Sequence, residues 1–85
     1  MVKVEWSERA LNDLDKLDAL IVRRILRKVS WFSKNFETVV PEPLTGEWRG
    51  TFKFRVGAWR VVYTVEGKRI VTQFIGHRRE IYKMR

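Results

Sequence analysis

The side chains of this sequence that could take part in chemistry are mostly cationic and phenolic, and they lie in its second half. Such a set can cleave RNA without a metal ion. The ribose 2′-hydroxyl attacks the neighbouring phosphorus, a base accepts the hydroxyl proton, and an acid protonates the leaving 5′-oxygen. Arginine offers a planar fork for phosphate oxygens, and fixed cations stabilise the charge that develops on the phosphorane. The candidates are Lys53, Arg55, Arg60, His77, Arg78, Arg79 and Tyr82.

Other kinds of site find little support in the sequence. It has no cysteine and a single histidine, so a structural zinc site is not expected. Neither glycine-rich phosphate loop, GxxxxGK[ST] or GxGxxG, occurs. No serine stands beside His77 in the sequence, and the carboxylates of the first half fit a solvated helix surface. We therefore expect a site that needs neither a metal nor an organic cofactor.

Positive charge is unevenly distributed along the chain. The formal net charge is +8, of which residues 1–42 contribute +1 and residues 43–85 contribute +7. A basic surface of this kind favours a polyanionic partner, with nucleic acid as the first candidate. The alternative is a small basic domain whose charge only keeps it soluble.

Two strands joined by a tight bend are predicted for residues 51–63. Apolar residues alternate with Lys53 and Arg55 in the first strand, and Arg60 is out of phase with the apolar residues of the second. Gly57 can adopt the positive φ that a short bend needs. If the hairpin closes in register, the three cations share one sheet face, where they repel one another unless an anion binds. Arg55 also has a structural interpretation, as a hydrogen-bond donor to loop carbonyls or to a carboxylate.

The elements that position these residues follow from the remaining pattern. Residues 2–6 alternate as a strand does, and Ser7 is a suitable N-cap for a helix over residues 8–17. Asp18 can cap a second helix that ends at residues 33–35 and carries one apolar stripe. The two helices are expected to form an antiparallel hairpin on one side of a sheet.

The remainder of the chain completes an α+β domain. Residues 35–48 contain two prolines and are predicted to be a loop, and residues 69–75 are predicted to be the last strand. Only three residues follow Tyr82, which leaves little room for a C-terminal helix. Residues 1–85 are thus expected to be one domain, a small twisted antiparallel sheet with the helical hairpin on one face and a basic face for RNA opposite. Because no signal peptide or membrane-spanning run is recognised, we expect a cytoplasmic protein.

Three segments carry a resemblance to a known family. They are Pro43-Leu44-x-Gly46, Gly50-x-Phe52-x-x-Arg55-Val56-Gly57-x-Trp59-Arg60-Val61-Val62-Tyr63 and Ile75-Gly76-His77-Arg78-x-x-Ile81-Tyr82. With them, nearly the whole chain resembles the RelE/ParE superfamily of bacterial and archaeal type II toxins. The last two segments together are fairly specific, and the resemblance implies the RelE-like βααβββ fold.

The superfamily has two main activities. RelE-type toxins cleave messenger RNA in the ribosomal A site, and ParE-type toxins poison DNA gyrase. The tail GHRREIY is more similar to the RelE-type branch, so the resemblance implies a ribosome-dependent endoribonuclease. Two alternatives stay open: a ParE-like gyrase inhibitor, and a catalytically inactive nucleic-acid-binding module on the same fold.

The resemblance also implies roles for individual residues. Arg60 and Arg78 would stabilise the transition state, and Lys53 would activate the 2′-hydroxyl or hold the phosphate. Tyr82 would stack on a base or take part in proton transfer. A role of His77 as acid or base is our own hypothesis, because histidine can exchange a proton near neutral pH. Further RNA contacts are assigned to Arg55, Arg79, Lys83 and Arg85.

Finally, the resemblance implies protein and RNA partners. A small acidic or amphipathic antitoxin, encoded next to the toxin, would wrap the helical hairpin or cover the basic face and so block entry to the ribosome. A toxin–antitoxin hetero-oligomer is therefore expected, with the ribosome and messenger RNA as the targets. No membrane partner is expected.

Overall fold

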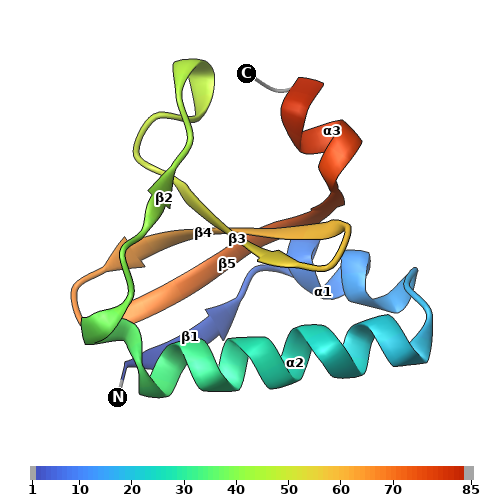
Figure 1. Cartoon of the computed structure of the whole chain (residues 1–85), viewed down its shortest axis with the longest axis horizontal. Helices are drawn as coiled ribbons and strands as arrows, with labels where there is room; N and C mark the ends of the chain where they lie inside the picture. The colour runs from blue at the N-terminus through green and yellow to red at the C-terminus, as the bar shows by residue number, and fades with distance from the viewer. Residues whose placement is uncertain (1, 84–85) are drawn as a thin grey trace.

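A computed structural model describes the backbone of residues 2–83 and the side chains of residues 2–81, and Figure 1 shows the order of its elements. Two helices come early, α1 over Glu8–Asp15 and α2 over Ala19–Lys34, and a short helix, α3, covers Arg78–Lys83. The strands and 3₁₀ turns are β1 (Lys3–Trp6), η1 (Phe36–Thr38), β2 (Glu42–Pro43), η2 (Gly46–Trp48), β3 (Phe52–Val56), β4 (Trp59–Glu66) and β5 (Arg69–His77).

Within this described part, the strands form one mixed sheet in the order β1-β5-β4-β3-β2. Neighbours from β2 to β5 are antiparallel, whereas β1 runs parallel to β5. The predicted α+β class is confirmed, and the parallel β1 is the departure from an antiparallel sheet. Short turns connect β3, β4 and β5 and so make them antiparallel. The chain that leaves β1 passes through two helices before it reaches the other strands, so no hairpin turn dictates the direction of β1.

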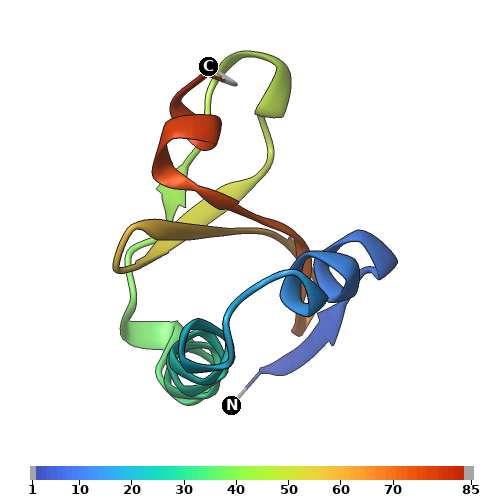
Figure 2. The same ribbon diagram turned by 90° about the vertical axis from the view of Figure 1, so that its right-hand side faces the viewer.

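Helix α2 lies across one face of the sheet, whereas α3 and the η2 loop lie on the other side (Figure 2). The apolar stripe of α2 supplies the helical side of the main core, with Ile25 completely buried. The ring of Phe32 stacks on Phe54 with 4.9 Å between centroids and meets Tyr63 edge-on at 5.1 Å. An amphipathic helix gains most of its stability from burying such a stripe, so α2 and the sheet stabilise each other.

Both predicted helices are found at nearly their expected bounds, and their caps explain why. The Ser7 side-chain oxygen accepts a hydrogen bond from the Ala10 amide at 3.0 Å. The Asp18 carboxylate accepts one from the Leu20 amide at 3.0 Å. Each cap satisfies an amide that has no partner inside its own helix, which fixes where the helix begins.

Helix α1 closes the edge of β5 where β1 ends. β1 pairs with β5 only from Arg69 to Thr72. Beyond that point, the Ser7 hydroxyl donates to the Gln73 carbonyl at 2.7 Å, and the Asp13 carboxylate accepts from the Ile75 amide at 2.9 Å. These side chains stand in for the missing strand, so α1 positions the end of β5.

Replacing Asp13 with alanine should lower the free energy of unfolding by about 1–3 kcal/mol, because the partly buried Ile75 amide loses its acceptor. Asp13→Asn keeps a side-chain oxygen and should lose less. Urea unfolding followed by circular dichroism measures both. Asp15→Ala, on the exposed side of the same helix, is the matched control. An equal loss in Asp13→Ala and Asp15→Ala would contradict the edge-closing role.

Two predictions about irregular segments were wrong. Residues 35–48, predicted as a loop, contain β2 and both 3₁₀ turns, because Glu42 and Pro43 pair with β3 at its outer edge, where proline is tolerated. The C-terminal helix thought to have little room is present as α3. Ile81 of α3 is almost completely buried against Val62 and Phe74, which holds this short helix on the sheet.

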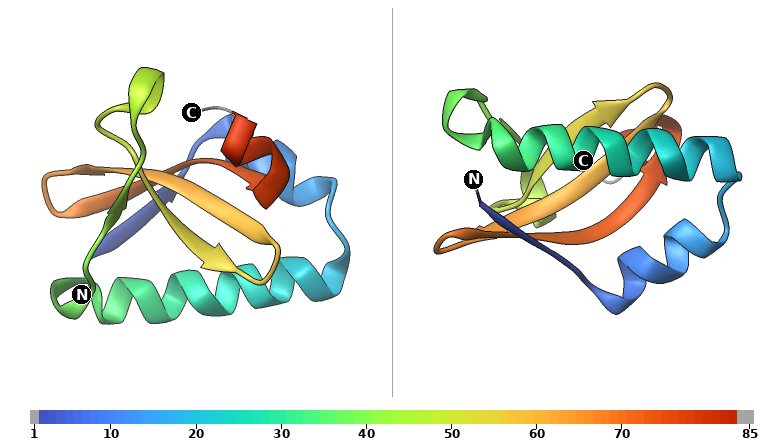
Figure 3. Two further views of the ribbon diagram at one scale, coloured as in Figure 1. Left: turned by 45° about the horizontal axis from the view of Figure 1, so that its top comes forward. Right: turned by 90° about the horizontal axis from the view of Figure 1, so that it is seen from below.

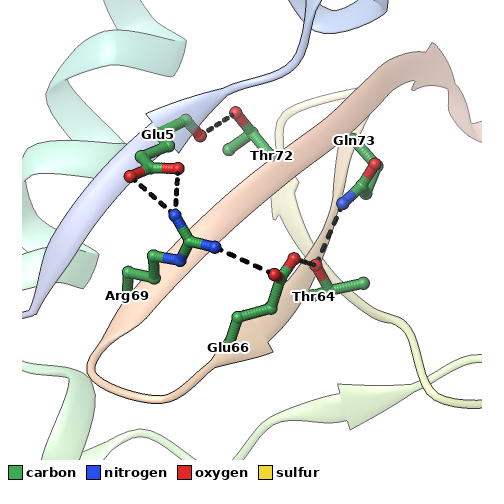
Figure 4. A network of polar contacts seen from close by, with 6 residues as sticks. All are labelled: Glu5, Thr64, Glu66, Arg69, Thr72 and Gln73. Atoms are coloured by element: carbon green, nitrogen blue, oxygen red, sulfur yellow. Dashed lines mark hydrogen bonds and ion pairs between the residues drawn. The ribbon is translucent and has the colours of Figure 1, made fainter.

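At the opposite end of β4 from the β3–β4 bend, a polar network joins three strands (Figure 4). Arg69 donates to both oxygens of Glu5, with the shorter contact at 2.8 Å, and to Glu66 at 3.1 Å. Exposed ion pairs contribute little to stability, so the main effect of this network is to hold β1 in register with β5.

No helix in residues 2–83 combines the length and apolar character needed to cross a membrane.

Candidate functional site

Two segments far apart in the sequence meet at the bend between β3 and β4. The Arg78 amide donates to the Ala58 carbonyl at 2.8 Å. The β4–β5 register places Trp59 opposite His77, with their rings edge-on and the centroids 5.4 Å apart. Figure 3 shows the bend beside the start of α3. The start of α3 is therefore fixed against the bend.

Three of the candidate cations share the sheet face that points away from α2. Arg55 and Arg60 are direct cross-strand partners, and Lys53 lies two residues before Arg55 on β3. Arg60 is also opposite Gly76 on β5, immediately before His77. The register thus brings the strand cations and the segment after β5 to one region of the sheet.

This face is nevertheless not an open cationic surface. A second apolar cluster of Leu44, Val62, Phe74 and Ile81 covers much of it, with Trp48 packed against the cluster. As a result, Lys53 is only 8% exposed and Arg60 only 4%. The face expected to be basic is therefore partly apolar and partly covered, because α3 and the η2 loop fold over it.

Arg60, rather than Arg55, donates to the carbonyls of the bend. Its Nη1 donates to Gly57 O at 2.9 Å and to Trp59 O at 3.0 Å, and its Nε is buried with no hydrogen-bond partner among the described residues. Arg55 is exposed and makes no hydrogen bond or ion pair to the described residues. The sequence interpretation therefore gave Arg55 the structural role, as donor to loop carbonyls, that its cross-strand partner Arg60 has.

His77 is held by the first turn of α3. Its Nδ1 accepts a hydrogen bond from the Arg79 amide at 3.3 Å. A ring nitrogen that accepts carries no proton, so the proton of the neutral imidazole lies on Nε2. In this tautomer His77 can donate a hydrogen bond from Nε2, and a role as acid or base would first require Nδ1 to release the Arg79 amide.

The other candidate residues lie on or after α3. Arg78 and Arg79 are exposed in its first turn. Tyr82 and Lys83 belong to the helix, but their side chains lie outside the described residues, as does all of Arg85. In residues 2–83, no group of three or more histidine, aspartate or glutamate side chains is arranged to hold a metal ion.

Two further arginines approach this region from the helices, and the sequence interpretation assigned neither of them to the site. The guanidinium of Arg24 on α2 lies over the bend, so that a Cβ at Gly57 would be 3.1 Å from its Nη2. Gly57 has a φ of +60°, and glycine therefore suits it on both counts. Arg9 of α1 lies 4.3 Å from the centre of the Phe74 ring. Helical periodicity places such residues on an outer face but cannot show what they touch.

Comparison with known proteins gives a consistent result. The profile of the family described as "ParE toxin of type II toxin-antitoxin system, parDE" matches residues 4–82. No curated protein matches. Among solved structures, a chain of the Mycobacterium tuberculosis toxin–antitoxin complex RelBE2 superposes with a TM-score of 0.79 at 26% identity, covering 89% of this chain and 96% of that one.

Two other solved structures show the same fold at lower identity. A chain of the RelB–RelE antitoxin–toxin complex from Methanococcus jannaschii has a TM-score of 0.70 and 21% identity, covering 92% of this chain and 94% of that one. A chain of the chromosomal ParDE system of P. aeruginosa has a TM-score of 0.69 and 18% identity, covering 91% and 96%. The fold is thus shared with solved structures of both a RelB–RelE system and a ParDE system.

Proposed function

This chain belongs to the ParE toxin family of type II toxin–antitoxin systems, within the RelE/ParE superfamily, and we propose that it is a ribosome-dependent endoribonuclease that cleaves messenger RNA in the A site. The supporting observation is the contact between the two segments with candidate cations, made by the Arg78 amide and the Ala58 carbonyl. A cluster of arginines held on rigid elements suits a phosphorane intermediate, because its donors need little reorganisation.

In the proposed reaction, the 2′-oxygen forms a bond to phosphorus and the bond from phosphorus to the 5′-oxygen breaks. Arg60 and Arg78 stabilise the negative charge on the phosphorane, and Arg60 does so through Nη2, because its Nη1 is engaged at the bend. Lys53 assists the 2′-hydroxyl or holds the phosphate. The 2′-hydroxyl loses a proton to a base and the leaving 5′-oxygen gains one from an acid. His77 serves as the base or, once protonated, as the acid, in either case after its Nδ1 releases the Arg79 amide, and Tyr82 stacks on a base or takes part in proton transfer.

Primer extension on a defined messenger in a reconstituted translation reaction tests this proposal. New cuts within A-site codons are expected with programmed ribosomes and not on naked RNA. Lys68→Glu, a change in the turn between β4 and β5, is expected to leave the cuts intact. An intact messenger with folded protein would contradict the proposal.

A cognate antitoxin is the expected partner, since two of the structures compared above are complexes of a toxin with its antitoxin. We propose that the protein encoded beside this toxin binds it in a hetero-oligomer in the cytoplasm. Gel filtration of the mixed pair should give one larger species, and separate elution would argue against this partner.

A second candidate function is inhibition of DNA gyrase. It is favoured by the burial of Lys53 and Arg60 and by the engagement of Arg60 with the bend carbonyls. A supercoiling assay separates the two functions. Loss of supercoiling by gyrase together with an intact ribosome-bound messenger would favour the inhibitor.

A further inference from the structure

The carboxylate of Glu80 on α3 lies against the end of β5, on the side of the sheet away from α2 (Figure 2). Gly76 is buried at this point, and a Cβ there would be 3.1 Å from Ile81 Cδ1 and 3.5 Å from Glu80 Oε2. Because Gly76 has no positive φ, glycine suits this position through the close approach of α3 and not through its backbone conformation. The missing side chain lets α3 place a carboxylate directly on the sheet.

This carboxylate lies on the same sheet face as Arg60. Arg60 and Gly76 are direct cross-strand partners, so their side-chain positions share one face. The Cβ positions of such a pair are about 5 Å apart, which puts Glu80 Oε2 within about 9 Å of Arg60 Cβ. Glu80 is exposed and makes no hydrogen bond or ion pair to the described residues. An unpaired carboxylate therefore lies beside the region in which Arg60 and Arg78 are proposed to hold a phosphate.

The proposed cleavage needs a group that accepts the proton of the 2′-hydroxyl. Lysine and arginine side chains normally keep their protons at neutral pH, whereas a carboxylate normally has none and can accept one. The cations of the site therefore suit the charge on the phosphorane but not this step. His77 is one candidate, but its Nδ1 already accepts from the Arg79 amide. Glu80 has no such partner to release.

We propose that Glu80 is the general base of the cleavage reaction, an inference that rests on the proposed ribonuclease function and deepens it. The 2′-hydroxyl transfers its proton to a carboxylate oxygen of Glu80 while the 2′-oxygen bonds to phosphorus. The bond from phosphorus to the 5′-oxygen then breaks, and the leaving oxygen takes a proton from protonated His77. The products are a 2′,3′-cyclic phosphate and a free 5′-hydroxyl. Water then removes the proton from Glu80 and returns one to His77.

Replacing Glu80 with glutamine keeps the size of the side chain but removes its ability to accept a proton. The single-turnover rate on programmed ribosomes should fall about 100-fold or more. Glu80→Asp keeps a carboxylate and should retain more activity. Glu37→Gln makes the same change at an exposed position in η1 and should cleave normally.

The alternative role of Glu80 is to stabilise α3, because a negative charge is favourable in the first turn of a helix. Urea unfolding tests this role, and Glu80→Gln should keep a midpoint close to that of the native chain. Glu42 is the other carboxylate to compare, since it is the cross-strand partner of Lys53. It lies on β2, with β3 and β4 between it and Gly76, so Glu42→Gln should cleave normally.

A messenger with sulfur in place of the bridging 5′-oxygen at the cut distinguishes a base from an acid. Sulfur leaves without being protonated, so it compensates for the loss of an acid but not for the loss of a base. Glu80→Gln should stay slow on this messenger, whereas His77→Ala should return to within about tenfold of the native rate.

Three results would overturn the assignment of Glu80. They are a native rate in Glu80→Gln, recovery of Glu80→Gln on the sulfur-containing messenger, and a loss of cleavage in Glu42→Gln that Glu80→Gln does not share. The native chain on the unmodified messenger is the reference for all of them. If the native chain leaves that messenger intact, the ribonuclease function itself fails, whereas native cleavage matched by Glu80→Gln contradicts only the role of Glu80.

Discussion

Replacing Arg60 with lysine should reduce the rate of ribosome-dependent cleavage about 100-fold or more. One preorganised donor to a developing oxyanion typically contributes that much to the rate. Lysine keeps the charge but loses the planar fork, which in Arg60 reaches two bend carbonyls through Nη1 while leaving Nη2 for a phosphate oxygen. Single-turnover cleavage on programmed ribosomes, measured by primer extension over time, reports this rate.

Two further variants separate catalysis from folding at Arg60. Arg60→Ala leaves the Gly57 and Trp59 carbonyls without this donor and should lower the free energy of unfolding by about 1–3 kcal/mol, more than Arg60→Lys does. Arg69→Lys makes the same substitution at an exposed arginine far from the bend and should cleave normally. Normal cleavage by a folded Arg60→Lys variant would remove Arg60 from the mechanism.

The free energy of unfolding should fall by about 2 kcal/mol more in the native chain than in Tyr63→Phe between pH 10 and 12. Tyr63 is completely buried, and this burial, with the nearby Glu42 carboxylate as a smaller cause, raises its pKa from 10.0 to about 12. In this pH range the unfolded chain loses the phenolic proton while the folded chain keeps it. The unfolded state then binds fewer protons, so stability declines as pH rises.

Urea unfolding at a series of pH values measures this difference. Lysine residues also titrate in this pH range, but they are the same in both proteins, so their effect cancels in the comparison. Glu42→Gln removes the smaller cause and should reduce the decline without abolishing it. Near neutral pH, Tyr63→Phe should leave the free energy of unfolding unchanged or raise it slightly, because the hydroxyl it removes is buried with no hydrogen-bond partner in the described part of the chain. Parallel pH curves for the native chain and Tyr63→Phe would show that Tyr63 ionises as easily in the folded state as in the unfolded one.

Local signals in the sequence were sufficient for most of the secondary structure. Ser7 and Asp18 marked the starts of both helices, because a capping side chain acts on amides only two or three residues away. The alternation around Gly57 likewise gave the hairpin and put Lys53, Arg55 and Arg60 on one face, because strand side chains alternate regardless of the rest of the fold. The similarity of nearly the whole chain to toxins of one superfamily was also readable from its motifs.

Tertiary packing decided what those residues can do. Arg55 and Arg60 have the same pattern in the sequence, yet only Arg60 donates to the bend carbonyls and is buried, because α3 and the η2 loop cover its part of the sheet. Helix α3 itself depends on the burial of Ile81 against Leu44, Val62 and Phe74, which lie earlier in the sequence. The parallel direction of β1 and the open edge beside Arg55 are likewise set by long-range pairing, which no local pattern records. The sequence alone therefore determined the first two helices, the central hairpin and the superfamily, whereas only the tertiary structure decided which cations are buried, which are exposed and which edge is left open.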